Sequence, residues 1–254
     1  MSGTSYRDTR FRPDVRGFYE RHNRDQSLAR ARERAEHWAQ RRIGRATVWE
    51  RFSELANVRD ASDGDLQGMS QLGHALQTAN AIREAGRSED WIVLGLVHDL
   101  GKLIQQHGER PEFVVGDIFP LGCAFSPKIR HAELLERNPD AGDPRYATRL
   151  GIYDEGCGLE QVTFAFGHDQ YLYEILRDRV PREIAWTIRH HSFQSIAGEY
   201  LFLFDESDRA LRQSHMIPFA AYDLYTKDPD QVCDEALDEY RELLERWFPE
   251  PLDW

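Results

Sequence analysis

The sequence predicts a single all-α domain, and three observations support this prediction. The chain has 254 residues, of which 41% are hydrophobic and 30% charged, so it can bury a sizeable core. Apolar residues recur at helical spacing along most of the chain, and no sustained period-two alternation predicts a strand. The sequence has no internal repeat and no low-complexity tract that would divide it.

The expected helices are separated by caps, prolines and loops. The first begins at Asp25 or Ser27, since both residue types suit an N-cap. The acidic stretch RDASDGD at 59–65 breaks the helical periodicity and predicts a loop. In order, helices are expected over residues 25–40, 46–57, 70–85, 89–106, 159–177, 182–193, 206–227 and 233–247.

Residues 108–158 do not follow the helical pattern. They are rich in glycine and proline, as in GERPEFVVGDIFPLGC and NPDAGDPRY, and predict a long irregular connection with one short helix near 129–137. Long ordered loops in compact domains often carry function. The runs EFVV and YLFLF are the two short segments with some strand character.

Charge and cysteine content argue against several classes of protein. The net charge of −12 disfavours nucleic-acid and membrane-surface partners, and the arginines concentrated in the first 51 residues are mixed with acids. The cysteines at 123, 157 and 233 lack paired spacing, which suits a reducing compartment. No apolar run is long enough to span a membrane, and the N-terminus has no signal-peptide core. We expect a cytoplasmic protein.

The stretch LGLVHDLGK, residues 94–102, places a histidine and an aspartate in an otherwise apolar run. Such a helix should be buried, and burying His98 beside Asp99 is unfavourable unless both are compensated. Neighbouring helical residues point about 100° apart, so the pair is poorly placed to satisfy itself. Both can reach a small metal centre, because a carboxylate can bridge two cations and a neutral imidazole can bind one.

Further histidines and aspartates lie in apolar helical context. Five of the ten histidines are interpreted as ordinary polar residues, namely His22, His37, His107, His131 and His215. The remaining candidates are His74 in QLGHALQTA, His168 in GHDQYLY, His190 and His191 in IRHHSF, and Asp223 in FAAYDLYTK. A set of four histidines and two aspartates without a thiolate suits iron or manganese better than structural zinc.

The order His, His-Asp, Asp along a helical chain resembles that of the HD-domain superfamily, and longer stretches resemble myo-inositol oxygenase. These stretches are HALQTANAIR, LGLVHDLGK, VVGDIFPLGC, NPDAGDPRYATRLGIY, CGLEQV, GHDQYLY, IRHHSF, DLYTKDPD and the closing LDW. The match covers most of the chain. Because GDIFPLGC and DLYTK are not general features of the superfamily, the combination is specific.

The resemblance implies an HD-type helical bundle over residues 1–254, in which 1–45 cover the site and 46–254 hold two iron ions. The pair would be mixed-valent Fe(II)/Fe(III), with Asp99 bridging the two ions. In IRHHSF the family's ligand directly precedes Ser-Phe, which assigns His191 and leaves His190 structural. The implied ligands are His74, His98, Asp99, His168, His191 and Asp223.

The resemblance also implies the reaction and the residues that serve it. Myo-inositol and dioxygen would give D-glucuronate and water, with Lys102 and Asp99 as the catalytic residues. Lys102 lies at i+4 from His98, so the two would share a helix face. We expect a monomer that takes a small polyol and no nucleic acid. The implied substrate-binding residues are Arg12, Asp60, Lys102, Gly116, Asp117, Ser192 and Lys227, with Tyr19 in the N-terminal cover.

One segment departs from the family pattern. After IRHHSF the family continues with Tyr-Pro-Trp, whereas this chain has Gln194, Ser195 and Ile196, and residues 194–215 match poorly. The identity of the substrate therefore stays open. A diiron oxygenase could act on another polyol or a hydroxyphosphonate. An HD metal-dependent phosphohydrolase would share part of the ligand set but would need more cationic groups. A metal-stabilised binding module without activity is the third alternative.

Overall fold

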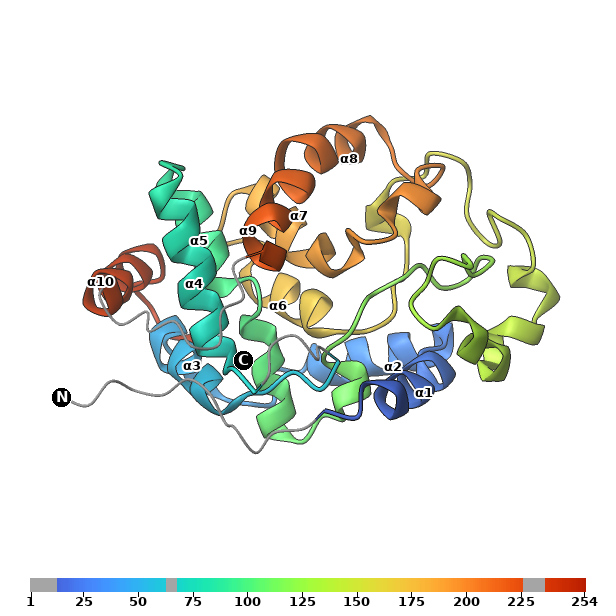
Figure 1. Ribbon diagram of the computed structural model, residues 1–254, viewed down its shortest axis with the longest axis horizontal. Helices are drawn as coiled ribbons and strands as arrows, with labels where there is room; N and C mark the ends of the chain where they lie inside the picture. Colours follow the sequence, from blue (N-terminus) through green and yellow to red (C-terminus); the bar gives the residue numbers. More distant parts are fainter. Residues whose placement is uncertain (1–12, 63–67, 226–235) are drawn as a thin grey trace.

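The computed structural model describes residues 13–62, 68–225 and 236–254. In these residues the chain forms ten α-helices and one two-stranded sheet, which confirms the all-α prediction (Figure 1). None of the described helices is both long and apolar enough to cross a membrane. The helices are α1 (Val15–Asp25), α2 (Leu28–Trp38), α3 (Val48–Glu54), α4 (Gln71–Glu84), α5 (Glu89–Val97), α6 (His168–Leu176), α7 (Arg182–His190), α8 (Glu206–Leu211), α9 (Ile217–Tyr225) and α10 (Leu237–Trp247).

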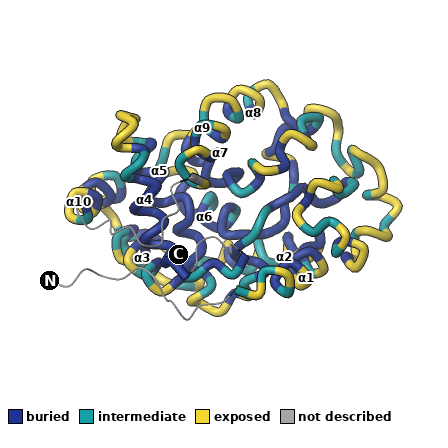
Figure 2. The backbone as a smooth tube through the Cα atoms, viewed as in Figure 1, coloured by how far each residue is buried: buried dark blue, intermediate teal, exposed yellow. Residues whose placement is uncertain are grey.

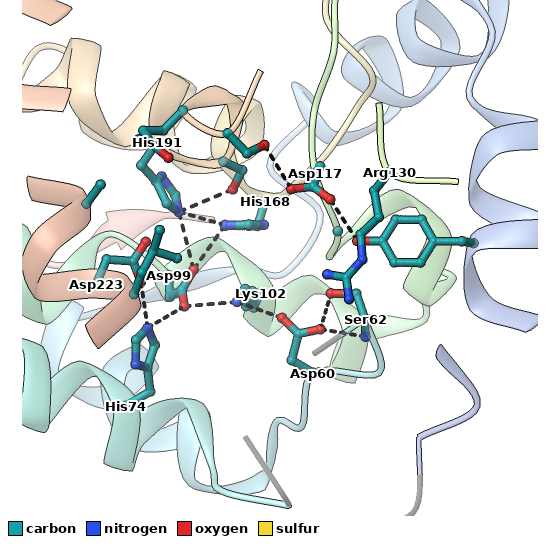
Figure 3. Close-up of a pocket in the computed structure, with 17 residues that line it drawn as sticks. Asp60, Ser62, His74, Asp99, Lys102, Asp117, Arg130, His168, His191 and Asp223 are labelled. Carbon is teal, nitrogen blue, oxygen red and sulfur yellow. Dashed lines mark hydrogen bonds and ion pairs between the residues drawn. The ribbon is translucent and has the colours of Figure 1, made fainter. Parts of the chain in front are cut away.

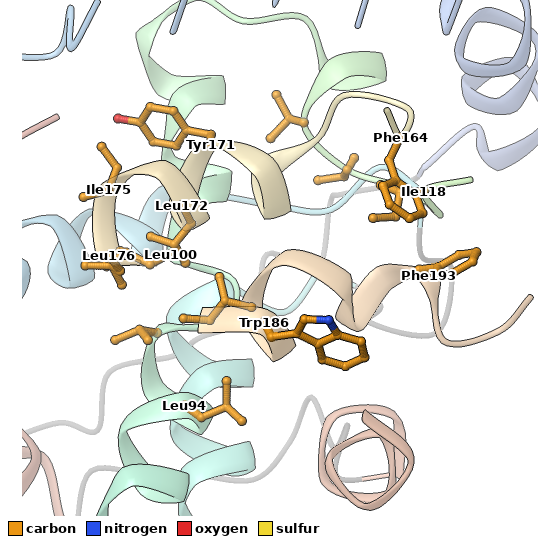
Figure 4. Close-up of a cluster of buried hydrophobic side chains, with 14 of the residues drawn as sticks. Leu94, Leu100, Ile118, Phe164, Tyr171, Leu172, Ile175, Leu176, Trp186 and Phe193 are labelled. Carbon is orange, nitrogen blue, oxygen red and sulfur yellow. The ribbon is translucent and has the colours of Figure 1, made fainter. Parts of the chain in front are cut away.

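The core lies where α4, α5, α6 and α7 meet. Buried backbone is concentrated there, and exposed segments surround it (Figure 2). Figure 4 shows Leu94 of α5, Leu172 of α6 and Trp186 of α7 in one apolar cluster. A fully buried leucine contributes roughly 1.5–3 kcal/mol to folding, so this cluster stabilises the packing of α5, α6 and α7 against one another. Buried apolar residues form one continuous set that extends from Phe18 to Trp254.

The helix predicted over 89–106 is interrupted at its most polar point. The α-helix α5 ends at Val97, and after His98 and Asp99 the chain continues as the 3₁₀ helix η2 (Leu100–His107). Over so few turns, the spacing of apolar residues does not distinguish an α-helix from a 3₁₀ helix. The interruption matters because residues at i and i+3 of a 3₁₀ helix eclipse one another.

Other predicted helices also begin or break at different residues. The segment 159–177 contains the short 3₁₀ helix η7 (Leu159–Gln161) and then an irregular stretch, so α6 begins at His168. A π-helical turn (Arg212–Met216) separates α8 from α9 within the predicted 206–227 helix. The end of the predicted 206–227 helix and the start of the 233–247 helix lie outside the described residues.

The N-terminal region contains a helix that is absent from the predicted set. Asp14 caps α1 by accepting a hydrogen bond from Gly17 N at 2.9 Å, and Ser27 rather than Asp25 caps α2. The buried face of α1 carries Phe18, Tyr19, His22 and Asn23, which mixes aromatic and polar residues and forms no aliphatic stripe. Its inward residues Val15, Phe18, Tyr19 and His22 do recur at helical spacing, a signal that could have found this helix.

The irregular connection over 108–158 has the predicted character and packs against α1. It consists mainly of turns and short 3₁₀ helices, including η4 (Ala132–Arg137) within the region where one short helix was expected. His22 of α1 lies 3.0 Å from Glu112 O and 3.1 Å from Asp117 O through its two ring nitrogens. A carbonyl oxygen only accepts, so His22 donates to one of these two groups when its ring is neutral, and it fixes the connection at the edge of the cavity described below.

The two suspected strand segments are not strands. EFVV overlaps the 3₁₀ helix η3 (Pro111–Phe113), and YLFLF follows the 3₁₀ helix η9 (Ala197–Tyr200) as a turn. The sheet instead pairs β1 (Arg45–Ala46) with β2 (Leu252–Asp253) in antiparallel register. Trp254 is fully buried beside it and donates a hydrogen bond from Nε1 to Ala46 O at 3.0 Å.

Candidate active site

A cavity of about 570 Å³ brings together chain segments that are far apart in the sequence (Figure 3). Its walls come from α1, α4, η2, α6, α9, the 3₁₀ helix η8 (His191–Phe193) that follows α7, and loops around 60, 116 and 130. The predicted residues in its lining are Tyr19, Asp60, His74, Asp99, Lys102, Gly116, Asp117, His168, His191, Ser192 and Asp223. His98 is not part of this lining, but its Nε2 lies within 3.5 Å of His74, Asp99 and Asp223.

One half of the centre joins α4, α5 and α9. His74 Nε2 lies 3.0 Å from Asp223 Oδ1 and 3.3 Å from His98 Nε2, and His98 Nε2 lies 3.5 Å from Asp223 Oδ1. Ser70 places His74 in the first turn of α4 by capping that helix at Gly73 N. The Nε2 atoms of two imidazoles and one carboxylate oxygen therefore lie within 3.5 Å of one another.

The other half joins α6 and η8. His168 Nε2 and His191 Nε2 lie 3.2 Å apart, and His168 Nε2 lies 3.0 Å from Asp99 Oδ1. Gly101 of η2 permits this approach, because a Cβ there would lie 2.3 Å from His168 O. This close packing explains the glycine in HDLGK.

Asp99 lies between the two halves. Its Oδ1 is 3.0 Å from His168 Nε2 and 3.5 Å from His191 Nε2, whereas its Oδ2 is 3.5 Å from His74 Nε2 and 3.4 Å from His98 Nε2. Each oxygen thus faces a different pair of imidazoles, as a carboxylate that bridges two cations would. The turn between α5 and η2 explains how adjacent residues His98 and Asp99 reach the same centre.

The donor chemistry of these side chains fits cations. Nδ1 of His168 lies 2.6 Å from Val114 O, and Nδ1 of His191 lies 2.9 Å from Ile188 O. A carbonyl oxygen only accepts, so each Nδ1 carries a proton, and an imidazole with one proton then has its lone pair at Nε2. Two lone pairs 3.2 Å apart repel, so an added proton or a metal ion must lie between them. His98 is held in the same way, with Nδ1 2.9 Å from Gly95 O.

Electrostatics reinforce this arrangement. Burial opposes charging His98, but Asp99 and Asp223 outweigh it and raise the pKa of His98 to about 10. Burial lowers the pKa of His74 despite its contact with Asp223. Burial disfavours the charged form of Asp99, yet Lys102 and the nearby imidazoles hold its pKa well below the ordinary range. Burial also disfavours the charged form of Asp223, and His74 and His98 hold its pKa well below the ordinary range. Two ionised carboxylates thus face four imidazoles.

Lys102 is buried in the cavity wall among oxygen acceptors. Its Nζ donates to Asp60 Oδ2 at 2.9 Å, Asp99 Oδ2 at 2.9 Å and Gln71 Oε1 at 3.1 Å. Burial alone would lower the pKa of Lys102, but Asp60 and Asp99 raise it above its ordinary value, so the side chain stays cationic. The sequence placed Lys102 through its i+4 spacing from His98. In the structure its i+3 spacing from Asp99 brings the two side chains together.

The wall opposite Lys102 is built around Asp117. The Tyr19 hydroxyl donates a hydrogen bond to Asp117 Oδ2 at 2.9 Å, and the Ser195 hydroxyl donates one to Asp117 Oδ1 at 3.3 Å. Gly116 precedes it with a φ of +96°, a conformation that glycine adopts readily. Ser192 lies at the bottom of this wall, with Oγ 3.4 Å from His191 Nε2. Arg12 and Lys227, also predicted to bind substrate, lie outside the described residues.

The geometry distinguishes the two adjacent histidines of IRHHSF. His191 faces the cavity, whereas His190 packs its ring against Trp186 and Phe164 and places Nδ1 2.8 Å from Trp186 O. Burial and the neighbouring Arg189 hold the pKa of His190 well below its ordinary value, so this ring is neutral. The arrangement supports His191 as the ligand and His190 as a core residue.

Several residues near the centre were not expected from the sequence. Arg130 lies over the ring of Tyr19, with its guanidinium carbon 5.1 Å from the ring centroid, and it lines the cavity. It belongs to the irregular connection, where no periodicity indicates which side chains point inward. Asp169 follows His168 in GHDQYLY and repeats the His-Asp pattern of residues 98–99, a signal that could have singled it out. The others are Ser62, Gln71, Gln194 and Ser195.

Comparison with known proteins identifies the family of this chain. The family described as myo-inositol oxygenase matches residues 12–254. Inositol oxygenase 1 of Arabidopsis thaliana is 36% identical over 99% of this chain and 85% of its own length. Inositol oxygenase 4 of the same plant is 42% identical over 82% of this chain and 68% of its length. The inositol oxygenase of Mus musculus is 38% identical over 82% of this chain and 75% of its length.

The family match spans nearly the whole described chain and includes every residue that meets at the centre. The relatives cover two thirds or more of both sequences at identities above 30%. On this evidence, the chain belongs to the myo-inositol oxygenase family.

Proposed function

We propose that this protein is an inositol oxygenase that cleaves the ring of myo-inositol with dioxygen to give D-glucuronate and water. The reaction balances without an external reductant, because the four electrons that dioxygen accepts come from the carbon atoms that are oxidised. The observation that carries the proposal is the meeting of four imidazoles and two carboxylates at the base of a polar cavity. Family membership supports the same reaction.

We assign the two iron ions to two groups of ligands. His74, His98 and Asp223 would hold one ion, His168 and His191 the other, and Asp99 would bridge them. The mixed nitrogen and oxygen donors without thiolate suit iron. When bound, the iron pair would supply Lewis acidity toward two vicinal hydroxyls and a site at which dioxygen is reduced.

The cavity wall suits a polyol, which offers many donors and acceptors and little apolar surface. Asp60 and Asp117 are acceptors in the lining, Ser192 lies near the centre, and Lys102 is a fixed cation. Asp117 is held by Tyr19 and Ser195, so its orientation is set before substrate binds. Preorganised groups of this kind lower the cost of fixing the substrate. Arg12 and Lys227 remain predicted substrate contacts.

Lys102 acts in this proposal as a charge stabiliser and not as a base. Two carboxylates keep its ammonium protonated, so it does not accept a proton from the substrate. Its three N–H groups already donate to Asp60, Asp99 and Gln71, so it acts on a substrate oxygen through its charge unless one of these bonds is exchanged. A cation fixed beside a hydroxyl favours the loss of that hydroxyl's proton and stabilises the oxyanion that results. Asp99 and Asp60 hold Nζ in place for this role.

The experiment loads the purified protein with iron without oxygen and then adds myo-inositol and dioxygen. We expect about two irons per chain, one dioxygen consumed per glucuronate formed, and no dependence on added reductant. One tightly bound zinc without a second metal would refute the iron assignment. Oxygen uptake with another polyol or a hydroxyphosphonate, and none with myo-inositol, would reassign the substrate. Phosphate release from a phosphoester without oxygen uptake would identify a hydrolase.

Three further predictions from the sequence accompany this proposal. A cytoplasmic location rests on the cysteines, of which Cys123 and Cys157 are unpaired among the described residues. A monomer and the division at residue 45 into a cover segment and a core also remain predictions. Tyr19 of α1 already lies in the cavity wall, which supports a covering role for residues before 45.

A further inference from the structure

Asp169 is a buried carboxylate next to the candidate metal centre that has no part in the chemistry proposed above. It is the second residue of α6 and only 1% of its surface is exposed. It does not line the cavity, because it lies behind His168 and His191 on the side of their Nδ1 atoms. A direct role toward substrate is therefore unsupported, and its surroundings must explain it.

The contacts of Asp169 connect it to both histidines of one half. Its Oδ1 lies 3.1 Å from His191 Nδ1 and accepts a hydrogen bond from Ser192 N at 3.4 Å. Its Oδ2 lies 3.5 Å from His168 Nδ1 and has no hydrogen-bond partner among the described residues. In the described part of the chain its ion-pair partners are these two imidazoles, with no lysine or arginine among them.

Such a carboxylate is unfavourable unless positive charge lies nearby. Burying an ion without a matched partner costs several kcal/mol in a protein interior. His168 and His191 cannot supply that charge when neutral, but a metal ion bound at their Nε2 atoms would place a cation on the far side of both rings. Asp169 would then be a carboxylate on the outer side of two metal-bound histidines at once.

The other half of the centre lacks an equivalent group. His98 Nδ1 contacts a neutral acceptor, Gly95 O, at 2.9 Å, and His74 Nδ1 has no hydrogen-bond partner among the described residues. The half of His74 and His98 instead has Asp223, a carboxylate on the Nε2 side of both rings. Because Nδ1 of His168 and of His191 already donates to Val114 O and Ile188 O, Asp169 acts on these two rings through its negative charge, which favours a cation at their Nε2 atoms.

We propose that Asp169 is a positioning residue that strengthens metal binding at His168 and His191 and lowers the reduction potential of the iron held there. The inference rests on the proposed function, since it requires that the centre holds two irons. It does not require that the substrate is myo-inositol. It predicts an effect on metal affinity and reduction potential that a purely structural carboxylate would not have.

The test compares Asp169→Asn with Asp208→Asn. Asp208 is also a buried carboxylate, but it accepts from Trp186 Nε1 at 2.8 Å and Leu159 N at 2.7 Å and does not line the cavity. We expect Asp169→Asn to weaken one of two ferrous equivalents by about 10–100-fold, the scale of losing an outer partner of a metal-bound histidine. The other equivalent should bind normally. The Fe(III)/Fe(II) potential should rise, and Asp208→Asn should leave both properties unchanged.

The readouts are anaerobic ferrous titration and the fraction of mixed-valent centre, measured by electron paramagnetic resonance, at a series of fixed potentials. Asp169→Ser, which is smaller and also neutral, should show the same direction and serves if the asparagine variant does not fold. Unchanged affinities and potential in a folded Asp169 variant, or equal shifts in Asp208→Asn, would overturn the inference. A wild-type protein that binds no iron pair would instead refute the proposed function.

Discussion

Removing Lys102 should affect both stability and catalysis, and a second substitution can separate the two effects. Its Nζ neutralises Asp60 and Asp99, so Lys102→Met leaves two buried carboxylates without their shared cation. We expect the free energy of unfolding to fall by about 3 kcal/mol, the scale of breaking a buried ion pair. Turnover of myo-inositol should fall by on the order of a hundredfold, the scale of losing one charged stabiliser. Iron content should be retained, because lysine is not a ligand.

The double variant Lys102→Met, Asp60→Asn is the matched control. Neutralising Asp60 removes one of the two unpaired charges, so thermal denaturation should show part of the lost stability restored. Turnover, measured as glucuronate formed per iron pair, should stay low because the cation is still missing. Recovery of turnover along with stability would show that Lys102 acts only through folding.

The adjacent histidines His190 and His191 give a second test at single residues. His191→Ala removes a nitrogen from the candidate centre, so one equivalent of iron and the activity should be lost together. His190→Ala leaves the centre intact but opens a void between Trp186 and Phe164. It should lower the free energy of unfolding by about 2 kcal/mol while iron content is kept. The opposite pattern in metal analysis and thermal denaturation would reverse the two assignments.

At the level of elements, the sequence indicated most helices because their buried faces repeat at helical spacing. It did not lead us to α1, although Val15, Phe18 and Tyr19 have helical spacing, and it could not indicate the change from α5 to η2 at Asp99. It did indicate that His98 and Asp99 are buried together, since an apolar run surrounds them. Arg130 escaped notice because irregular segments have no period from which the direction of a side chain follows.

The contact between η2 and α6 predicts the effect of Gly101→Ala. The added Cβ would lie 2.3 Å from His168 O, a backbone atom, so η2 and α6 must move apart. We expect the free energy of unfolding to fall by about 2–3 kcal/mol, as in other overpacked sites. One iron equivalent should also bind more weakly, because His168 moves with α6. Thermal denaturation and ferrous titration provide the two measurements.

Gly142→Ala is the control for that change. Gly142 ends the 3₁₀ helix η5 (Pro139–Gly142), and a Cβ there would have no neighbour within 4 Å. This variant should keep the stability and iron content of the wild type. Gly101→Ala with normal iron affinity would show that the approach of η2 to α6 does not position His168.

At the scale of the whole molecule, the fold gathers ligands from five separate regions of the chain, namely α4, the junction of α5 and η2, α6, η8 and α9. The sequence could indicate which residues are buried and polar, but the pairing of His74 with Asp223, 149 positions away, depends on how α4 packs beside α9. The same holds for Asp117 and Tyr19, which α1 and the irregular connection bring together. Family resemblance supplied those partners in advance, whereas spacing alone could not.

The shared charge of the centre also predicts how the stability of the whole protein depends on pH. In metal-free protein the pKa of His98 is raised from 6.5 to about 10 by Asp99 and Asp223, against the effect of burial. A raised pKa in the folded state stabilises the fold fully below pH 6.5, and this contribution is lost as the pH rises through 10. Iron takes the place of that proton, so the loaded centre has no such dependence.

We therefore expect the melting temperature of metal-free protein to fall between pH 7 and pH 10. The melting temperature of iron-loaded protein should change less over this range. Iron should therefore raise the melting temperature most near pH 10. Loading at pH 7.5 should release protons, which an indicator dye can measure, because His98 must lose one to bind metal. His98→Gln cannot take up that proton, and its metal-free form should show a flatter curve. Parallel curves for metal-free and loaded wild type, with no proton release, would mean that His98 is neutral before iron arrives.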